Sequence, residues 1–474
     1  MRLASAALRS PSSWLRRSRL VVGVLSASLC IGSFAPATGL LAQEASRSEL
    51  RAKGTQASEE FARLFDAVVK TTSENFWDQD QLAAIGWERR AGEARKACVE
   101  APKLEEAARC INALLGELKT SHTGLLTPDD VDYYILLDVF GGGRGFKELI
   151  AERFRGGGVR YAGIGLFSVR IEGRDFVDAV LEGSAAERAG LKVGDEIVGV
   201  DGAPYHPIRS FRGKVGDEVA LTLRRAANAP AETLTIEVAS IAPLRAFREA
   251  TAASARVIER DGRRVGYVRV WASVGDKSVK ALTDALAELG VNSYQGDSRS
   301  EKATAPPARL DGVIIDMRGK IGGTGRNAGR YLEAIDPRGP NVRSRNKRAV
   351  ARATVRGRTA VLIDHHTRST AELFVHSYKR ERQGLLIGTR TAGAVAGAAG
   401  FPMPGGNLLY LAISGLEVDG EILEGPGVAP DLEVARPIPY AQGADPVFDA
   451  AVEHLLRRAK GREEAGRDGK GPSQ

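Results

Sequence analysis

Hydroxyl, imidazole and carboxyl side chains occur in a few short stretches where they could support nucleophilic catalysis. The stretch "TRSTAELFVH" (367–376) follows the apolar run "TAVLID" and two histidines, and it places Ser369 at a strand-to-helix turn, three residues before Glu372. A serine at such a turn is either a helix cap or a nucleophile. As a nucleophile it needs a base, because an unassisted hydroxyl attacks weakly. His365 and His366 lie close by, but neighbouring strand residues face opposite ways, so we interpret them as packing residues.

Several motifs resemble the C-terminal processing serine peptidases, and more closely their tricorn-core-like branch. They are "LLGELKTSHTG", "DGVIIDMRGKIGG", "LIDHHTRSTAELF" and "LEGPGVAPDLEV". The resemblance implies that Ser369 is the nucleophile and that His122 takes its proton. It further implies that Ser121 orients the imidazole and that Glu424 binds Ser121, which completes a Ser-His-Ser-Glu tetrad. The pairing of His122 with Ser369 follows from the resemblance, since no spacing in the sequence connects them.

The chain departs from the family pattern at the position of the base. Many relatives carry a lysine about 25 residues after the nucleophile, whereas "IGTRTAGAVAG" has Ala394 there. Two interpretations follow: the protein is inactive, or it uses another base, for which His122 is the candidate. Lys320 is a less favoured replacement base, because it also fits a solvated surface lysine. An unperturbed imidazole would set the acid limb of activity near pH 6.5.

The glycine-rich loop after "VIIDMR" fits an oxyanion hole, because glycines let a backbone amide approach a substrate closely. We expect Gly322 to be one donor, with Gly323 as a register alternative, and the Thr370 amide to be the other. The loop differs from the usual Asn-Gly-Gly-Gly, since Lys320 and Ile321 replace the asparagine and the first glycine.

The pattern along the chain predicts three structural regions. Residues 43–140 form an N-terminal helical subdomain that carries the Ser-His pair, because apolar residues recur at spacings of three and four. Residues 161–242 form a β-rich region of short strands and turns. Residues 263–437 form an α/β core, with strands such as "DGVIIDMRG" and "RTAVLID" followed by turn or helix sequence. By the resemblance this core is a crotonase-like peptidase core built from ββα-type units.

The β-rich region resembles a PDZ domain through "GIGL" (163–166) and "GSAAERAGLKVGDEIVGVDG" (183–202). The resemblance implies that the loop of Gly163, Ile164, Gly165 and Leu166 receives the C-terminal carboxylate of a peptide, which adds as a strand to the sheet edge. The alternative is a PDZ fold that serves only as a spacer or lid.

The two ends of the chain predict segments outside these domains. Five arginines, the short apolar run "LVVGVLSASLCIG" and small residues around Ala42 predict a signal peptide over residues 1–42. The apolar run is shorter than the roughly 20 residues of a membrane span, so no transmembrane segment remains after cleavage. The charged residues 455–474 predict a disordered tail. The remaining cysteines, Cys98 and Cys110, predict a disulfide in an oxidising compartment, with two buried thiols as the alternative.

Composition narrows the class of protein further. The net charge of +8 is spread along the chain and lacks the clustered basic face of a nucleic-acid binder. No His-Glu-x-x-His motif or cysteine cluster occurs, so neither a metal nor another cofactor is expected.

Together these features predict an exported serine endopeptidase, periplasmic or extracellular, that cleaves polypeptides and recognises their C-termini through its PDZ groove. The alternatives are a catalytically inactive binding protein on a peptidase fold and a PDZ adaptor. The oligomeric state stays undetermined.

Overall fold

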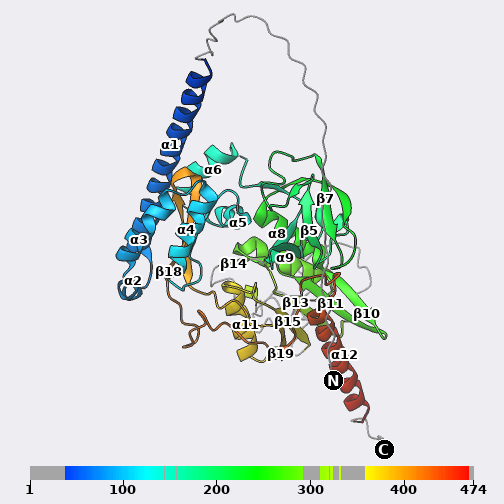
Figure 1. Cartoon of the computed structure of the whole chain (residues 1–474). Helices are drawn as coiled ribbons and strands as arrows, with labels where there is room; N and C mark the ends of the chain where they lie inside the picture. Colours follow the sequence, from blue (N-terminus) through cyan, green and yellow to red (C-terminus); the bar gives the residue numbers. More distant parts are fainter. Residues whose placement is uncertain are drawn as a thin grey trace, which may run out of the picture. The chain divides into compact units, whose positions relative to one another are not determined.

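The computed structural model describes residues 38–143, 145–155, 157–291, 310–319, 321–323, 330–331 and 358–468 (Figure 1). Most of the predicted signal peptide, the polar sequence of residues 294–309, which we expect to form a surface insertion loop, Lys320 and the last six residues lie outside the described residues. The chain divides into a unit of residues 1–53 and a unit of residues 54–474. The helix α1 (Thr38–Asn75) crosses this division and includes the predicted cleavage point near Ala42. Everything below concerns the second unit.

The α/β core is built on a mainly parallel sheet with strand order β10-β11-β13-β15-β16-β19, in which only the β10–β11 pair is antiparallel. Its strands alternate between two buried faces: Val313 and Ile315 pack under α9 and α11, while Ile314 packs under α12. This period of two gives a three-layer α/β/α arrangement. The bounds are β10 (Arg256–Arg260), β11 (Arg263–Arg269), β13 (Gly312–Asp316), β15 (Thr359–Ile363), β16 (Leu385–Gly388), β19 (Leu432–Glu433), α9 (Gly275–Glu288), α11 (Thr370–Arg380) and α12 (Pro446–Asp468).

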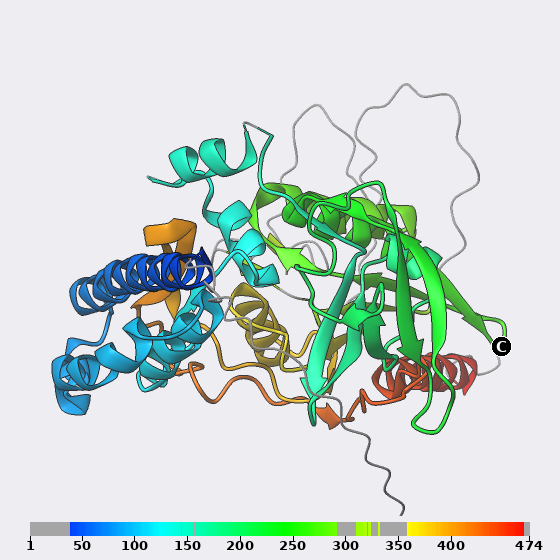
Figure 2. The same ribbon diagram turned by 45° about the horizontal axis from the view of Figure 1, so that its top comes forward.

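The N-terminal part is helical, and a hairpin from the far end of the chain completes it. The strand β1 (Gly124–Leu126) pairs with β18 (Asn407–Ser414), which pairs with β17 (Gly397–Met403), and their apolar residues share one core with the helices. In both views the orange hairpin lies against the blue helices (Figures 1 and 2). The helices are α2 (Gln79–Ile85), α3 (Trp87–Val99), α4 (Leu104–Gly116), α5 (Val131–Phe140) and α6 (Phe146–Phe154), and η1 (Pro404–Gly406) joins the two hairpin strands.

Cys98 of α3 and Cys110 of α4 are joined by a disulfide with a Cα–Cα distance of 5.3 Å. Cys98 is fully buried within the helical core, and Cys110 is partly buried against it. It closes a loop of 12 residues between two helices that pack side by side.

The β-rich region forms an antiparallel sheet of order β3-β4-β5-β7-β8, with β6 on β5, and the short pair β2–β9 beside it. Its core is separate from that of the α/β part. The chain returns to the core through α8 (Pro243–Ser254), which leads into β10 and β11. The short strand β12 (Ala272–Ser273) follows β11 and pairs with β14 (Ile321–Gly323). The bounds are β2 (Tyr161–Gly163), β3 (Leu166–Ile171), β4 (Arg174–Val180), α7 (Ala185–Arg188), β5 (Glu196–Val200), β6 (Ala203–Pro204), β7 (Glu218–Arg224), β8 (Glu232–Glu237) and β9 (Ala239–Ile241).

The C-terminal segment differs from the sequence prediction. Residues 455–468, predicted as part of a disordered tail, continue the helix α12. Val447, Ala451, Val452 and Leu455 are almost fully buried against the sheet. Their spacing of four, one and three residues puts them on one helix face, and this packing outweighs the charge of the sequence that follows.

Among the helices of the described residues, none combines the length and the hydropathy that a membrane span requires.

Candidate active site

Ser369 lies at the N-terminal end of α11, directly after the turn that follows β15. Its backbone has φ 56° and ψ −128°, a left-handed conformation that is strained for a residue with a side chain. Its backbone N–H donates to the Ala394 carbonyl at 2.8 Å and to Glu372 Oε2 at 3.2 Å. A strained serine that links a buried strand to a helix is the geometry of a nucleophile elbow.

Glu372 holds the strained turn and the segment that carries Ala394 together. Its fully buried carboxylate accepts hydrogen bonds from the Thr391 hydroxyl at 2.6 Å and from the amides of Gly393 and Ala394 at 2.7 Å. Burial raises the pKa of Glu372, although these donors oppose the shift. The segment where many relatives carry a lysine therefore has a structural role here through its backbone.

Ser121, His122 and Glu424 lie together, although up to 303 residues separate them in sequence. The Ser121 hydroxyl is 2.8 Å from His122 Nδ1 and 3.0 Å from Glu424 Oε2, and the Ser121 amide donates to Glu424 Oε1 at 2.8 Å. The second carboxylate oxygen also accepts from the amides of Val395 and Ala396 at 2.8 and 2.9 Å. Glu424 thus ties the Ser-His pair to the segment that follows Ala394.

The hydrogen bonds around Ser121 select one tautomer of the imidazole. Burial raises the pKa of Glu424, but the donated hydrogen bonds lower it more, so the carboxylate is ionised and can only accept. The single Ser121 proton then goes to Glu424, and the Ser121 oxygen accepts the proton on His122 Nδ1. This leaves His122 Nε2 without a proton and able to act as a base. The imidazole also meets the Tyr410 ring edge-on, with centroids 5.2 Å apart.

His122 is held neutral by its surroundings. Burial, and then the positive charge of Arg368, lower the pKa of His122 from 6.5 to about 4, and the Glu424 carboxylate opposes this only in part. Arg368 directly precedes Ser369 in the chain, so the residue that lowers the pKa of the candidate base is the neighbour of the candidate nucleophile. The contacts of the described residues include no hydrogen bond between Ser369 Oγ and His122. Such bonds are often long in free enzymes and shorten when substrate binds.

The glycine loop lies directly against Ser369. A Cβ atom on Gly322 would come within 2.3 Å of Ser369 Cβ and 2.7 Å of its Oγ, so only glycine fits. The Gly323 amide donates to Thr370 Oγ1 at 3.0 Å. Because the Gly323 amide already donates to a side chain, Gly322 is the better of the two candidates for the oxyanion-hole donor. The Thr370 amide opens α11, where backbone N–H groups lack helical partners. Lys320 lies outside the described residues.

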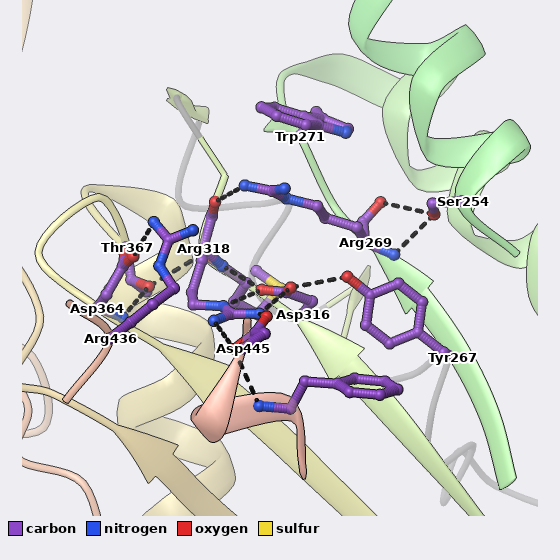
Figure 3. A network of polar contacts seen from close by, with 12 residues as sticks. Ser254, Tyr267, Arg269, Trp271, Asp316, Arg318, Asp364, Thr367, Arg436 and Asp445 are labelled. Atoms are coloured by element: carbon purple, nitrogen blue, oxygen red, sulfur yellow. Dashed lines mark hydrogen bonds and ion pairs between the residues drawn. The ribbon is translucent and has the colours of Figure 1, made fainter. Parts of the chain in front are cut away.

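A buried ionic network supports this loop and the nucleophile turn (Figure 3). Arg318 donates to Asp316 at 2.7 and 2.9 Å and to Asp445 at the same two distances, while the Tyr267 hydroxyl donates to Asp316 at 2.8 Å. Burial raises the pKa of Asp316, but the Arg318 charge lowers it well below its ordinary value. The network holds the end of β13 next to the turn, where Thr367 Oγ1 donates to the Met317 carbonyl at 3.0 Å.

The β-rich region contacts the nucleophile turn through Asp178, which is 2% exposed. His366 Nε2 is 2.9 Å from Asp178 Oδ2, and the Arg436 guanidinium is 3.3 Å from Oδ1. Glu182 accepts from the Trp271 indole at 2.5 Å. His366 was expected to pack locally, whereas this polar contact links the two domains.

The residues of the predicted carboxylate loop are largely enclosed by their own domain. Ile164 is 2% and Leu166 8% exposed. The Ile164 and Gly165 carbonyls accept from the amides of Ala186 and Leu181 at 2.8 and 2.9 Å. Ile164 and Gly165 also line a cavity of about 520 Å³ shared with α8. Phe167, next in the chain, packs against the rings of Phe247 and Trp271, which also stack on each other, and this cluster fixes β3 against the core.

Comparison with known proteins identifies the class to which these domains belong. Residues 264–434 match the model of peptidase family S41, and residues 176–225 match a PDZ domain. The chain therefore contains a domain of peptidase family S41 and a PDZ domain, which confirms the family resemblance and the α/β fold class predicted from the motifs.

Two relatives illustrate the similarity at the level of sequence. The putative tricorn protease homolog 2 of Streptomyces coelicolor is 25% identical over 426 residues, which cover 84% of this chain and 32% of that protein. The carboxy-terminal processing protease CtpA of Bacillus subtilis is 25% identical over 321 residues, which cover 63% of this chain and 60% of that protein. The chain thus spans between 32% and 60% of the length of these relatives.

Solved structures similar to this chain include the photosystem II D1 C-terminal processing protease and the tricorn protease. The first has a TM-score of 0.44 and 20% identity, and covers 82% of this chain and 98% of its own. The second has a TM-score of 0.46 and 18% identity, and covers 85% of this chain and 37% of its own.

Two supporting residues of the site were not found from the sequence: Arg368, which sets the charge around His122, and Tyr410, which flanks its ring. Arg368 could have been singled out by its nearness to Ser369. Glu372 was noted for its place three residues after Ser369, but its role in organising the turn was not predicted. No sequence signal pointed to Tyr410, because it reaches the site through the pairing of β18 with β1.

Proposed function

We propose that this protein is a serine endopeptidase that uses Ser369 as its nucleophile and His122 as its base. The observation that carries the proposal is the chain of contacts from Glu424 through Ser121 to His122 Nδ1, which leaves Nε2 free to accept a proton. The match to peptidase family S41 and the relatives named as processing proteases support the same activity.

In the proposed reaction, His122 Nε2 takes the Ser369 proton as Oγ attacks the carbonyl carbon of the substrate peptide bond. The oxyanion that forms is held by the amides of Gly322 and Thr370. The protonated imidazole then gives its proton to the leaving amine, and water attacks the acyl-enzyme in a second step with the same base. Glu424 stabilises the imidazolium through Ser121, at one remove.

We further propose that the protein is exported and that its PDZ domain binds the C-termini of substrates. The leader sequence supports export, and so does the Cys98–Cys110 disulfide, because such bonds persist in oxidising compartments. The PDZ match supports peptide binding.

A fluorophosphonate probe tests the active serine, since it forms a covalent bond only with an activated hydroxyl. We expect the wild-type protein to be labelled at Ser369, Ser369→Ala to be unlabelled and to lose casein hydrolysis, and His122→Ala to lose nearly as much. The double variant should be little worse than either single one, because the two residues act as a unit. His365→Ala is the matched control, as its imidazole is exposed beside the same turn.

Three results would contradict the proposal. Hydrolysis at the wild-type rate by Ser369→Ala would exclude it as the nucleophile. An active His122→Ala together with an inactive Lys320→Ala would assign the base to Lys320. An unlabelled, inactive wild-type protein would favour the binding protein on a peptidase fold.

A further inference from the structure

Two cavities border the short sheet formed by β2 and β9, away from Ser369. One has a volume of about 370 Å³ and the other of about 520 Å³, and Arg160 and Ser240 line both. The smaller cavity lies where the PDZ region meets α5 and α6, and it includes none of the residues 163–166 of the predicted carboxylate loop. Its volume falls in the range of ordinary ligand sites.

Aromatic rings form one wall of the smaller cavity. The Tyr134 ring lies 5.3 Å from the ring of Tyr161 and 6.3 Å from that of Phe154. Tyr134 and Tyr161 are 7% and 9% exposed, and the Tyr134 hydroxyl donates to the Pro128 carbonyl at 2.9 Å. The two tyrosines are therefore held in place before any ligand arrives, and a flat or bulky apolar side chain could pack on this wall at little entropic cost.

The charged side chains that line the smaller cavity are positive. Arg153, Arg160 and Arg212 line it, and among the residues that the structure describes no acidic one does. Arg212 pairs with Asp129. Arg153 and Arg160 instead donate to the backbone carbonyls of Gly406 and Gly157, and no carboxylate of the described residues forms a salt bridge with either. Two guanidinium groups thus border an aromatic cavity without a charged partner, and the guanidinium fork matches a carboxylate well.

We propose that this cavity is a second peptide-binding site, separate from the predicted PDZ groove, which takes a carboxylate next to an aromatic or bulky apolar side chain. Arg153 and Arg160 bind the carboxylate, and the side chain packs on Tyr134 and Phe154. The carboxylate belongs either to the C-terminus of the peptide or to an internal acidic residue, since both present the same chemistry.

The surroundings of the cavity favour an extended peptide as the occupant. Residues 239–242 line the larger cavity, so a chain that continues from the smaller one would run beside β9. In the described part of the chain β9 pairs with β2 alone, which leaves its other edge for a further strand. The choice of a peptide rests on the proposed peptidase function, whereas the chemistry of the cavity does not depend on it.

Isothermal titration calorimetry on the full chain tests this site, with Ser369→Ala present so that peptides stay intact. The probes are acetyl-GSGSSF with a free C-terminus, the same peptide with a C-terminal amide, and acetyl-GSEFGS with a C-terminal amide. We expect a carboxylate-bearing peptide to bind at least about tenfold more tightly than the neutral amide at low salt. Binding of the first peptide alone assigns the carboxylate to the C-terminus, and binding of the third as well includes acidic side chains.

The variant Arg153→Gln/Arg160→Gln should weaken carboxylate-dependent binding at least about tenfold and leave the unfolding midpoint unchanged, because both side chains are exposed. Arg160 also lines the larger cavity, whereas Phe154 lines the smaller one alone, so Phe154→Ala should likewise weaken binding severalfold, without altering charge. Full binding to Phe154→Ala would place the peptide in the larger cavity and overturn the proposal. The matched control, Arg89→Gln/Arg170→Gln, removes two exposed arginines elsewhere.

Equal binding of all three peptides, no binding of any, or full binding to Arg153→Gln/Arg160→Gln would overturn the proposal. The last result would place the peptide in the PDZ groove. Because the heat of binding does not depend on Ser369, an inactive wild-type enzyme would refute the proposed function and leave this test intact.

Discussion

The chemistry of His122 depends on where one proton lies. Glu424 is ionised and takes the proton of Ser121, so the imidazole must hold its own proton on Nδ1. Burial and the Arg368 charge keep the ring neutral over most of the pH range. A neutral imidazole with a free Nε2 is the form that a serine nucleophile requires.

The pH dependence of activity should reflect this environment. Because the base must be neutral, kcat/KM on a peptide substrate should rise with pH along a limb centred near the His122 pKa of about 4, below the 6.5 of an ordinary imidazole. Arg368→Gln removes a cause of the lowered pKa, so its limb should move to higher pH. The control Arg89→Gln should keep the wild-type limb. A wild-type limb at pH 6.5 or above would count against this picture.

Gly322 leaves room for Ser369, and the smallest possible side chain should disrupt that contact. Gly322→Ala places a Cβ atom 2.3 Å from Ser369 Cβ, so the serine or the loop must shift. We expect kcat to fall by about 10²–10³-fold, the cost of losing an oxyanion-hole donor, with the far-UV circular dichroism unchanged. Gly92→Ala is the control, because nothing lies within 4 Å of its added Cβ. Wild-type kcat in Gly322→Ala would refute the contact.

Among the elements, the end of β13 carries the groups that set the position of the glycine loop. Asp316 is fully buried and Arg318 is 3% exposed, and both lie in the network that also includes Asp445 at the start of α12. Asp445, directly before α12, therefore contributes an anchoring group close to the site. A buried charge without its partner is costly, whereas the intact pair is satisfied.

Removing the Asp316 charge should destabilise the protein as a whole. Asp316→Asn leaves Arg318 buried with one carboxylate in place of two, and we expect the free energy of unfolding to fall by about 3–5 kcal/mol. Urea denaturation followed by circular dichroism measures this loss. Asp284→Asn breaks an exposed pair with Lys280 and should cost less than about 1 kcal/mol. Equal losses in the two variants would show that the network does not carry stability.

In the molecule as a whole, the PDZ region and the peptidase core meet at the nucleophile turn. Asp178 at the end of β4 contacts both His366 and Arg436, and Glu182 holds Trp271. The nucleophile turn is thus held in part by contacts with the PDZ region, although the PDZ region has a hydrophobic core of its own.

Weakening the contact between Asp178 and Arg436 should increase the mobility of both the PDZ region and the nucleophile turn. Arg436→Met removes a guanidinium from the nearly fully buried Asp178, so amide hydrogen exchange should speed up in β4 and in residues 364–369. Because the turn carries Ser369, kcat should fall severalfold. Arg170→Met, which removes an exposed arginine from the same β-rich region, should change neither. Faster exchange in β4 alone would show that the turn is independent of the PDZ region.

Local patterns in the sequence were sufficient to predict the structural features that depend on residues close together in the chain. Apolar residues three and four apart mark the helices of the N-terminal part, and the run "TAVLID" before Ser369 marks the strand and the turn. The family motifs led to peptidase family S41 and the α/β class, which the comparisons confirm. The roles of Ser369, His122, Ser121 and Glu424 stay predictions until the variants are measured.

Tertiary structure decided what depends on residues far apart in the chain. Glu424 reaches Ser121 across 303 positions, and β18 brings Tyr410 to His122 by pairing with β1. The pKa of His122 follows from its burial, which has no sequence signature, and from the charge of Arg368, whose place beside Ser369 in the sequence does not by itself put it near His122. The C-terminal part of α12 was predicted to be disordered, because the packing on the sheet that stabilises the helix cannot be read from its charged sequence. Burial, charge proximity and strand pairing are properties of the folded chain, so composition and local spacing cannot supply them.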